Sequence, residues 1–592
     1  MSPPDRPAAA RADRLYDAVA GVVLVGAVLA TLHWADIRSG STPHAAFLAN
    51  VAGVFAVAVG LAFSTRGDRI AMLPPFERWE LYAVVAVTLV GAIMRSARWD
   101  VFPPADGQLL EEPQTAWNAV RSIRFGHLDL SFPLIDLVGE VGFRMFDRTM
   151  TGLRIPFVVL GILSVPIFYL AARDFLRTSH AALFVTALFA TNSMLAGSSR
   201  IALETMHAIA TTVVAMAVTF RAGRRPTVGN CALAGAFNGL LLTEYDSYRI
   251  VAVLSLIFLV MQFAVDAFDR PRRDGPAARR AGIASLANLF VFVGFVAAIE
   301  ASRTLISESL SPFEFLGEAV RRHGSFLQEH RAVMTWGQVL AEEFDKWQSN
   351  VQFLFLRGDR ADILPPSMGL FDPYTGALGV VAFGFCVARA RRNPLRLFPV
   401  IAVALLTVLS SVLVGTVARY RLLPVIPFAL LLIGALVEAI GHAPRARRWV
   451  DGALVVIAIG IASVNVQRFF GVAIWDAQVQ ATFYDLSMVL SHEISGLQRE
   501  HPDAPVFLLS DQVHLGGTND YAFWYDYESV HVFDTPAALR GHTGYLLAHD
   551  QFIPRPEDLP TMRDCRQWKT KFDRNVLLCC RLASQTEVEA GP

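Results

Sequence analysis

Long apolar runs limit what this chain can fold into more than any other feature of its sequence. Most runs have roughly 17–22 residues, and a helix of about 20 apolar residues spans the hydrocarbon core of a bilayer. The runs lie near residues 15–34, 44–63, 80–97, 153–172, 180–197, 204–221, 228–243, 248–266, 282–301, 373–390, 396–415, 421–440 and 450–467. They predict an α-helical polytopic membrane protein with about thirteen transmembrane helices.

Composition agrees with a membrane location. Apolar residues make up 54% of the chain and charged residues 18%, whereas a soluble domain has about 45–50% and about 25%, respectively. The formal net charge is zero, so the overall charge gives no indication of a nucleic-acid partner. The first run is too long for the apolar region of a signal peptide, which has about 7–15 residues, and we expect it to remain as a transmembrane helix.

Basic residues indicate how the runs are oriented. Five arginine clusters lie between them, at Arg173 and Arg177; Arg221, Arg224 and Arg225; Arg270, Arg272, Arg273, Arg279 and Arg280; Arg389, Arg391, Arg392 and Arg396; and Arg445, Arg447 and Arg448. All five fall on one side if the runs alternate, and the positive-inside rule makes that side the cytoplasm. The outer side then holds two long connections, 98–152 and 302–372, and a polar tail.

These assignments divide the chain into three parts. Residues 1–79 hold two N-terminal transmembrane helices, residues 80–467 hold the main transmembrane module, and residues 468–592 form an extracytoplasmic domain. In the last part the short apolar runs PVFLLS, SVHVF, GYLLAH and VLLCCRLA are typical of a small α/β domain. If this part is extracytoplasmic, one disulfide bridge can form there, between Cys565 and either Cys579 or Cys580.

The first long connection contains the sequence LLEEPQTAWNAV. Pro113 suits the first turn of a helix, because its missing N–H would have no partner there. Gly126 suits the position after the last turn. The sequence thus predicts a helix from about 113 to 125, with Glu112 at the N-cap and Glu111 just before it, where the helix dipole favours a carboxylate.

Both long connections carry side chains that suit a membrane surface. Tryptophan and arginine on the predicted helix indicate that it lies in the interface plane, and FPLIDLVGEVGFRMFDRTMTGLR can supply a second such helix. Arg144, Arg148 and Arg154 oppose the positive-inside trend, and we expect an anionic lipid headgroup to attract them. In the second connection, Trp336 and Trp347 suit interface anchors, and we interpret this segment as a lid over the outer cavity.

Several segments resemble one family of membrane enzymes. FPPADGQLLEEPQTAWNAVRSIRFG is similar to the first outer loop of the GT-C glycosyltransferases, nearest to family 39 and its relatives, the protein O-mannosyltransferase and aminoarabinose transferase type. In that family an Asp-Glu pair opens an interfacial helix. Glu111 matches the first acid, with Glu in place of Asp, and Glu112 matches the second. SMLAGSSRIALETMHAIA and ARYRLLPVIPFALL resemble later family segments, and the resemblance covers roughly residues 80–440.

The resemblance implies a fold and an activity. Enzymes of this family are integral membrane proteins that take a sugar from a polyprenyl- or dolichyl-phosphate carrier and pass it, with inversion, to an acceptor on the outer side. The expected partners are therefore a polyprenyl-phosphate-linked sugar donor, membrane lipids, and an acceptor protein, lipid or envelope glycan. No cofactor is required, although a divalent cation is conceivable. The expected location is the bacterial inner membrane, with the active site extracytoplasmic.

Chemistry assigns roles to individual residues. A carboxylate at the water interface can act as general base; we assign this role to Glu111, with Glu112 orienting the acceptor or the base. The candidate substrate-binding residues are Arg200, Glu204, Glu244, Tyr245, Asp246, Arg249, Arg419, Tyr420 and Arg421.

These substrate-binding residues have alternative readings. The arginines suit phosphate because a guanidinium binds it bidentately, but such residues at span ends also extend toward lipid headgroups. Glu244 and Asp246 form a second acidic pair, for the acceptor or a divalent cation. Glu204 and His207, one helical turn apart, either face one cavity or form a structural pair.

Other functions fit parts of the same pattern. A transporter or flippase for lipid-linked sugars would also span the membrane many times, but such proteins usually show internal repeats, and this sequence shows no convincing repeat. An oligosaccharide ligase is the enzymatic alternative. A non-catalytic scaffold whose tail binds envelope partners is the third, and the bulky outer connections argue against it.

The topology makes the first testable prediction. Single cysteines introduced at Glu111 and Arg419 should react with a membrane-impermeant thiol reagent from the side opposite to a cysteine at Arg272. Labelling of all three positions from the same side of sealed vesicles would contradict this topology.

Overall fold

The computed structural model describes most of the helical region and the strands near the C-terminus. The described residues are 43–64, 77–103, 112–125, 133–146, 149–176, 178–268, 276–304, 335–355, 364–365, 367–412, 419–440, 447–481, 493–494, 496–509, 530–533, 535–549, 554–555, 557–569 and 576–584. The expected first transmembrane helix, near 15–34, lies outside these residues.

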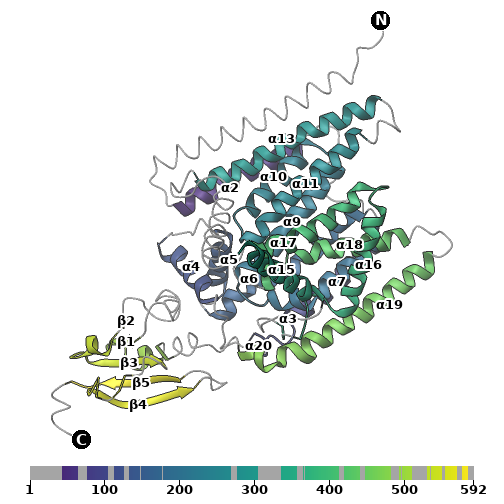
Figure 1. Cartoon of the computed structure of the whole chain (residues 1–592). Coiled ribbons are helices and arrows are strands. Elements are labelled where there is room, and N and C mark those ends of the chain that lie inside the picture. Colours follow the sequence, from purple (N-terminus) through teal and green to yellow (C-terminus); the bar gives the residue numbers. More distant parts are fainter. Residues whose placement is uncertain are drawn as a thin grey trace.

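Helices make up most of the described chain (Figure 1). In chain order they are α2 (Pro43–Ser64), α3 (Arg78–Ser96), α4 (Glu112–Phe125), α5 (Pro133–Met145), α6 (Met150–Leu176), α7 (Ser179–Thr191), α8 (Ser193–Ser198), α9 (Glu204–Arg224), α10 (Val228–Leu241), α11 (Asp246–Phe268), α13 (Pro276–Thr304), α15 (Trp336–Phe355), α16 (Pro373–Arg389), α17 (Leu397–Val412), α18 (Val425–Ile440), α19 (Arg447–Val466) and α20 (Ala477–Ala481). Short helical turns are η1 (Pro394–Arg396), η2 (Arg419–Leu422), η3 (Gln467–Val472) and η4 (Ala473–Trp475).

Several of these helices suit a membrane by length and composition. Among the described residues, four are long and apolar enough to cross a bilayer, at Arg78–Ser96, Met150–Leu176, Ser247–Asp266 and Val450–Trp475. Seven shorter apolar helices accompany them. The chain is thus a mostly helical integral membrane protein, and the count of about thirteen spans stays a prediction.

One end of the helical body is held together by buried charges. Arg221 at the end of α9 lies 3.2 Å from Asp174 at the end of α6. Glu80 at the start of α3 accepts hydrogen bonds from Tyr169 of α6 and Ser179 of α7. The ends of α6 and α9 therefore meet the starts of α3 and α7, as alternating spans require. We call this end the basic end, because three of the predicted arginine clusters contribute to it, through Arg173, Arg221, Arg224 and Arg396.

One predicted span is broken. The run 180–197 forms two helices, α7 and α8, separated at Asn192. The side chain of Asn192 accepts a hydrogen bond from the Leu195 N–H at 3.0 Å and donates to the Leu370 carbonyl at 3.1 Å. An asparagine that bonds to nearby backbone groups competes with a continuous helix, which is why hydropathy alone does not show the break.

The first long connection contains the two helices that the sequence predicts. α4 begins at Glu112, one residue before the predicted start, and α5 follows it along the chain. The two helices pack closely, because a Cβ added to Gly139 of α5 would lie 3.0 Å from the Ala119 Cβ of α4. A Cβ at Gly142 would lie 2.8 Å from the Gly152 carbonyl oxygen, so glycine allows α5 to approach the start of α6.

Within the second long connection, the structure describes the helix α15. The Thr335 N–H and hydroxyl both donate to the Gln338 side chain, a capping arrangement that fixes the start of the helix. The end of α15 is hydrogen-bonded to the segment before α16, where the Leu370 N–H donates to the Phe353 carbonyl at 2.8 Å. The helix also packs against α17 and η2. Its proposed role as a lid stays a prediction.

The C-terminal part contains a five-stranded sheet, drawn in yellow at the lower left of Figure 1. The strands are β1 (Val506–Leu509), β2 (Val530–Phe533), β3 (Gly544–His549), β4 (Met562–Lys569) and β5 (Val576–Leu582), in the spatial order β2-β1-β3-β5-β4. β1 pairs in parallel with β2 and β3, while β5 pairs antiparallel with β3 and β4. Four of these strands arise from the predicted apolar runs.

One disulfide joins the edge strand β4 to its antiparallel neighbour β5. Cys565 of β4 is bonded to Cys580 of β5, which decides between the two pairings that the sequence left open. Cys565 lies where the β4–β5 register shifts, between Arg563 and Arg566. Cys579 is a free buried thiol, and burial raises its pKa to about 11.

This arrangement predicts two different cysteine reactivities. Under non-reducing conditions, peptide mapping should recover Cys565 linked to Cys580. Cys579 should resist alkylation at pH 7–8 until the domain is unfolded, because a buried thiol with a raised pKa holds almost no thiolate. Recovery of a Cys565–Cys579 peptide, or rapid alkylation of Cys579 in the native protein, would contradict this structure.

Candidate active site

A buried ion pair lies at the end of the helical body opposite the basic end. Arg154, near the start of α6, donates from Nε to Oε1 of Glu112 at 2.8 Å and from Nη2 to Oε2 at 2.6 Å. The two side chains are 1% and 0% exposed. This parallel, two-bond geometry is the strongest form of a guanidinium–carboxylate pair, and it fixes both groups.

Glu112 also receives a main-chain hydrogen bond. The Ala202 N–H, in the turn that leads into α9, donates to Oε1 of Glu112 at 2.9 Å. The carboxylate therefore joins α4, α6 and the turn before α9. These contacts suit a residue that positions its surroundings better than one that removes a proton. Glu111, the predicted general base, lies outside the described residues.

A second buried pair lies on the neighbouring face of α6. His207 of α9 contacts Glu244 through its Nε2, and both side chains are almost fully buried. The Thr211 hydroxyl donates to the other carboxylate oxygen of Glu244 at 2.9 Å. The ring of Phe157, one turn along α6 from Arg154, meets the His207 ring edge-on at 6.3 Å. Phe157 thus connects the helix that carries Arg154 to the His207–Glu244 contact.

His207 has a partner that the sequence did not indicate. The turn between α10 and α11 brings Glu244 onto His207. The spacing of Glu204 and His207 predicts that these two face one cavity or form a structural pair. The side chains of Glu204 and Asp246 lie outside the described set, so the predicted Glu244–Asp246 pair stays a prediction.

Tyr245 extends the site toward η2. The Arg421 Nε donates to the Tyr245 hydroxyl at 2.7 Å, and the guanidinium carbon lies 5.6 Å from the ring centroid. Arg421 is half-buried, so part of it remains accessible. Arg419 and Tyr420 belong to η2, but their side chains are not described.

Two of the predicted phosphate-binding arginines, Arg200 and Arg249, are buried in the protein. Arg200 is 0% exposed and its terminal nitrogens donate to three main-chain carbonyls, those of Met94, Ala97 and Phe102. Arg249 is 4% exposed, and its Nε donates to the Glu244 carbonyl at 2.6 Å. Both guanidinium groups hold chain segments together, and the structure presents neither to solvent. Of the candidate arginines whose side chains are described, Arg421 is half-buried, whereas Arg200 and Arg249 are buried.

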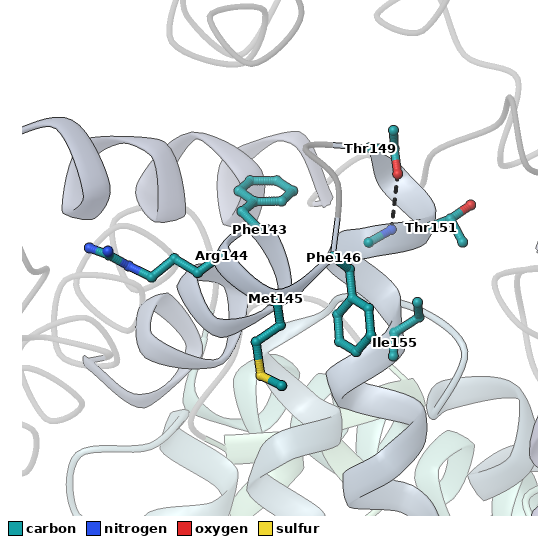
Figure 2. A pocket seen from close by; sticks show the side chains of 8 residues that line it. Phe143, Arg144, Met145, Phe146, Thr149, Thr151 and Ile155 are labelled. Atoms are coloured by element: carbon teal, nitrogen blue, oxygen red, sulfur yellow. Dashed lines mark hydrogen bonds between the residues drawn. The ribbon is translucent and has the colours of Figure 1, made fainter.

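A pocket of about 600 Å³ lies where α5 meets α6 (Figure 2). Its lining residues are Phe143, Arg144, Met145, Phe146, Thr149, Thr151, Gly152 and Ile155. The Arg144 Nε donates to Glu140 at 2.7 Å, and the Thr149 hydroxyl accepts the Gly152 N–H. Arg144 is 59% exposed and can still reach a lipid headgroup, as the sequence predicts. Arg154 cannot, because it is buried against Glu112.

No metal centre is formed by the residues described in this structure, since they contain no group of three His, Cys, Asp or Glu side chains close enough to hold an ion. The divalent cation that the sequence left open therefore has no identified ligands among these residues.

Sequence reasoning missed two residues of this site. Arg154 lies in a connection that the sequence predicts to be on the outer side, where arginine is disfavoured, and this is a signal that it is paired. For His207 the sequence offers Glu204, its neighbour on the same helix, and gives no signal for Glu244. The partner that each residue contacts in the structure is distant in the sequence, 42 residues away for Arg154.

Comparison with known proteins gave results only at the level of structure. No family model matches the sequence, and no curated protein matches it. Among solved structures, the chain is similar to the oligosaccharyltransferase of Archaeoglobus fulgidus in the apo form, with a TM-score of 0.45 and 14% identity over 77% of this chain. The chain spans 64% of that protein's length.

The chain is also similar to ArnT from Cupriavidus metallidurans. With ArnT bound to undecaprenyl phosphate, the TM-score is 0.44 and the identity 16%, over 85% of this chain and 97% of the other. With apo ArnT, the TM-score is 0.44 and the identity 14% over the same shares. ArnT and the oligosaccharyltransferase are both GT-C glycosyltransferases, the superfamily that the sequence motifs resemble.

The Glu112–Arg154 pair makes a prediction about stability. Arg154→Met should destabilise the protein by about 3–5 kcal/mol, because it leaves a buried carboxylate without its counter-ion. Arg144→Met removes a pair whose arginine is 59% exposed, and should cost less than about 1 kcal/mol. Thermal unfolding of both variants in the same detergent measures the difference. Equal melting temperatures for the two variants would show that the buried pair is not a structural anchor.

Proposed function

We propose that this chain is a membrane glycosyltransferase with a GT-C-like fold, which moves a sugar from a polyprenyl-phosphate donor to an acceptor hydroxyl. The observation that carries the proposal is the fixed position of Glu112. It lies opposite the basic end, where Arg154 and the Ala202 N–H hold it, and it directly follows Glu111 in the sequence. Of the two acids that match the family motif, Glu112 is thus held in place by buried contacts.

The two acids then take different roles. Successive residues of a helix diverge by about 100°, so we expect only one of two adjacent acids to face the acceptor directly. In this proposal Glu111 faces the acceptor and takes the proton from its hydroxyl. Glu112, neutralised by Arg154, keeps the start of α4 in place and adds no uncompensated negative charge beside the base.

The transfer itself balances without a further reactant. The acceptor oxygen forms a bond to the anomeric carbon as the bond from that carbon to the phosphate oxygen breaks. The electron pair leaves with the polyprenyl phosphate, and the acceptor proton goes to Glu111. Arg421 suits the leaving phosphate, since it is half-buried and oriented by Tyr245.

Two observations support an extracytoplasmic site. The Cys565–Cys580 disulfide suits an oxidising compartment, in which such bonds persist. The clustered arginines at the basic end suit the cytoplasmic side, and the Glu112 pair lies at the opposite end. Together they favour a C-terminal domain and a site on the same, outer side of the membrane.

Substitution of the first acid tests this proposal. Glu111→Gln should lower transfer from a radiolabelled polyprenyl-phosphate sugar in proteoliposomes by about 10²–10⁴-fold, because the general base is lost, while the melting temperature stays unchanged. Glu77→Gln, an exposed glutamate before α3, is the matched control and should keep full activity. Normal turnover by Glu111→Gln would remove the general-base assignment.

A further inference from the structure

Two arginines that are fully enclosed in the protein lie close together near the site. Arg95 is in the last turn of α3, and Arg200 is in the turn between α8 and α9. Both are 0% exposed. Arg200 donates to the carbonyls of Met94 and Ala97, which flank Arg95 in the sequence. We call these two side chains the di-arginine centre.

Main-chain carbonyls satisfy only part of this centre. The Nη1 of Arg95 donates to the Gly91 and Ala190 carbonyls at 3.1 and 2.8 Å. Its Nε and Nη2 are buried and have no hydrogen-bond partner, and the Nε of Arg200 has none either. Three donor nitrogens of two cations are therefore left without an acceptor in a closed environment. Buried donors of this kind normally have a protein, water or ion partner.

The charge of the centre is also not balanced by an acid. No described carboxylate lies within ion-pairing distance of either guanidinium group, whereas Arg154, Arg173 and Arg221 all have one. The ends of α3 and α7 contribute partial negative charges of about −0.5 each, and the Arg200 guanidinium carbon lies 4.8 Å from the Phe469 ring centroid. These terms offset part of two full charges, because arginine stays protonated in proteins.

We propose that the di-arginine centre binds a small inorganic anion, for which chloride is the probe. An anion would accept hydrogen bonds from the unpartnered nitrogens and would cancel one of two positive charges that repel each other. The packing beside Arg95 is close, since a Cβ added to Gly161 would lie 2.6 Å from the Ser199 Cβ and 3.2 Å from the Arg95 Nε, and this favours a monatomic anion over a larger one.

The position of the centre gives the anion a structural consequence. Arg200 is two residues before Ala202, whose N–H bonds to Glu112. An anion that holds Arg200 against the end of α3 therefore also steadies the turn that supports Glu112. This inference stands on the geometry of the two arginines alone and does not depend on the proposed transfer reaction.

Anion exchange tests the proposal on the full-length protein. In detergent at constant ionic strength, replacing gluconate by chloride should raise the melting temperature by about 3 °C in a saturable manner. Arg95→Met should abolish this dependence. Arg98→Met, whose arginine is 51% exposed and faces Asp100 at 3.7 Å, is the matched control and should keep it. Crystals grown in bromide should show an anomalous peak beside both guanidinium groups.

The same measurements can overturn the proposal. Equal melting temperatures of the unmodified protein in chloride and gluconate, with no bromide peak at the centre, would exclude a bound anion. A chloride effect that persists unchanged in Arg95→Met would place the anion elsewhere and contradict the assignment. If Arg95→Met does not fold, the titration of the unmodified protein and the bromide peak still decide. If the unmodified protein shows the chloride response but no sugar transfer, the proposed function is contradicted and the anion site is not.

Discussion

The buried pair of Glu112 and Arg154 is the interaction on which the rest of the site depends. Two charges at this depth are tolerated only when their geometry is good and their remaining hydrogen-bonding capacity is used. The two-bond contact and the Ala202 N–H meet both conditions. As a result, the helix α4, the long helix α6 and the turn before α9 are all bonded to one carboxylate.

The surrounding contacts extend this frame across the end of the helical body. From Arg154, the ring of Phe157 leads to His207 and Glu244, and the next residue, Tyr245, leads to Arg421. Glu112 opens α4 and bonds to the turn that precedes α9, so helix N-termini face its negative charge. The opposite end is built from arginines and Glu80. The two ends therefore differ in both chemistry and expected side of the membrane.

The sequence predicted those features that depend on local pattern. A helix near 113–125, a second helix within the segment 132–154, the C-terminal strands and a cysteine pair follow from apolar periodicity, proline and glycine signals, and spacing. The break at Asn192 and the partners of Arg154 and His207 depend on chain segments that meet only in the folded protein, and no linear pattern encodes them. The same reason explains Arg200: an arginine at the end of a predicted span looks available in the sequence, whereas in the fold it is buried and bonded to carbonyls at and just beyond the end of α3.

The account makes one central claim, that the two adjacent glutamates are divided between structure and chemistry. A structure of the complex with a donor analogue and an acceptor tests it most directly. The account predicts that Glu112 stays on Arg154 while a Glu111 carboxylate oxygen lies about 2.6–3.2 Å from the acceptor hydroxyl. A complex in which Glu112 leaves Arg154 to contact the acceptor, or in which Glu111 faces away from it, would contradict the claim.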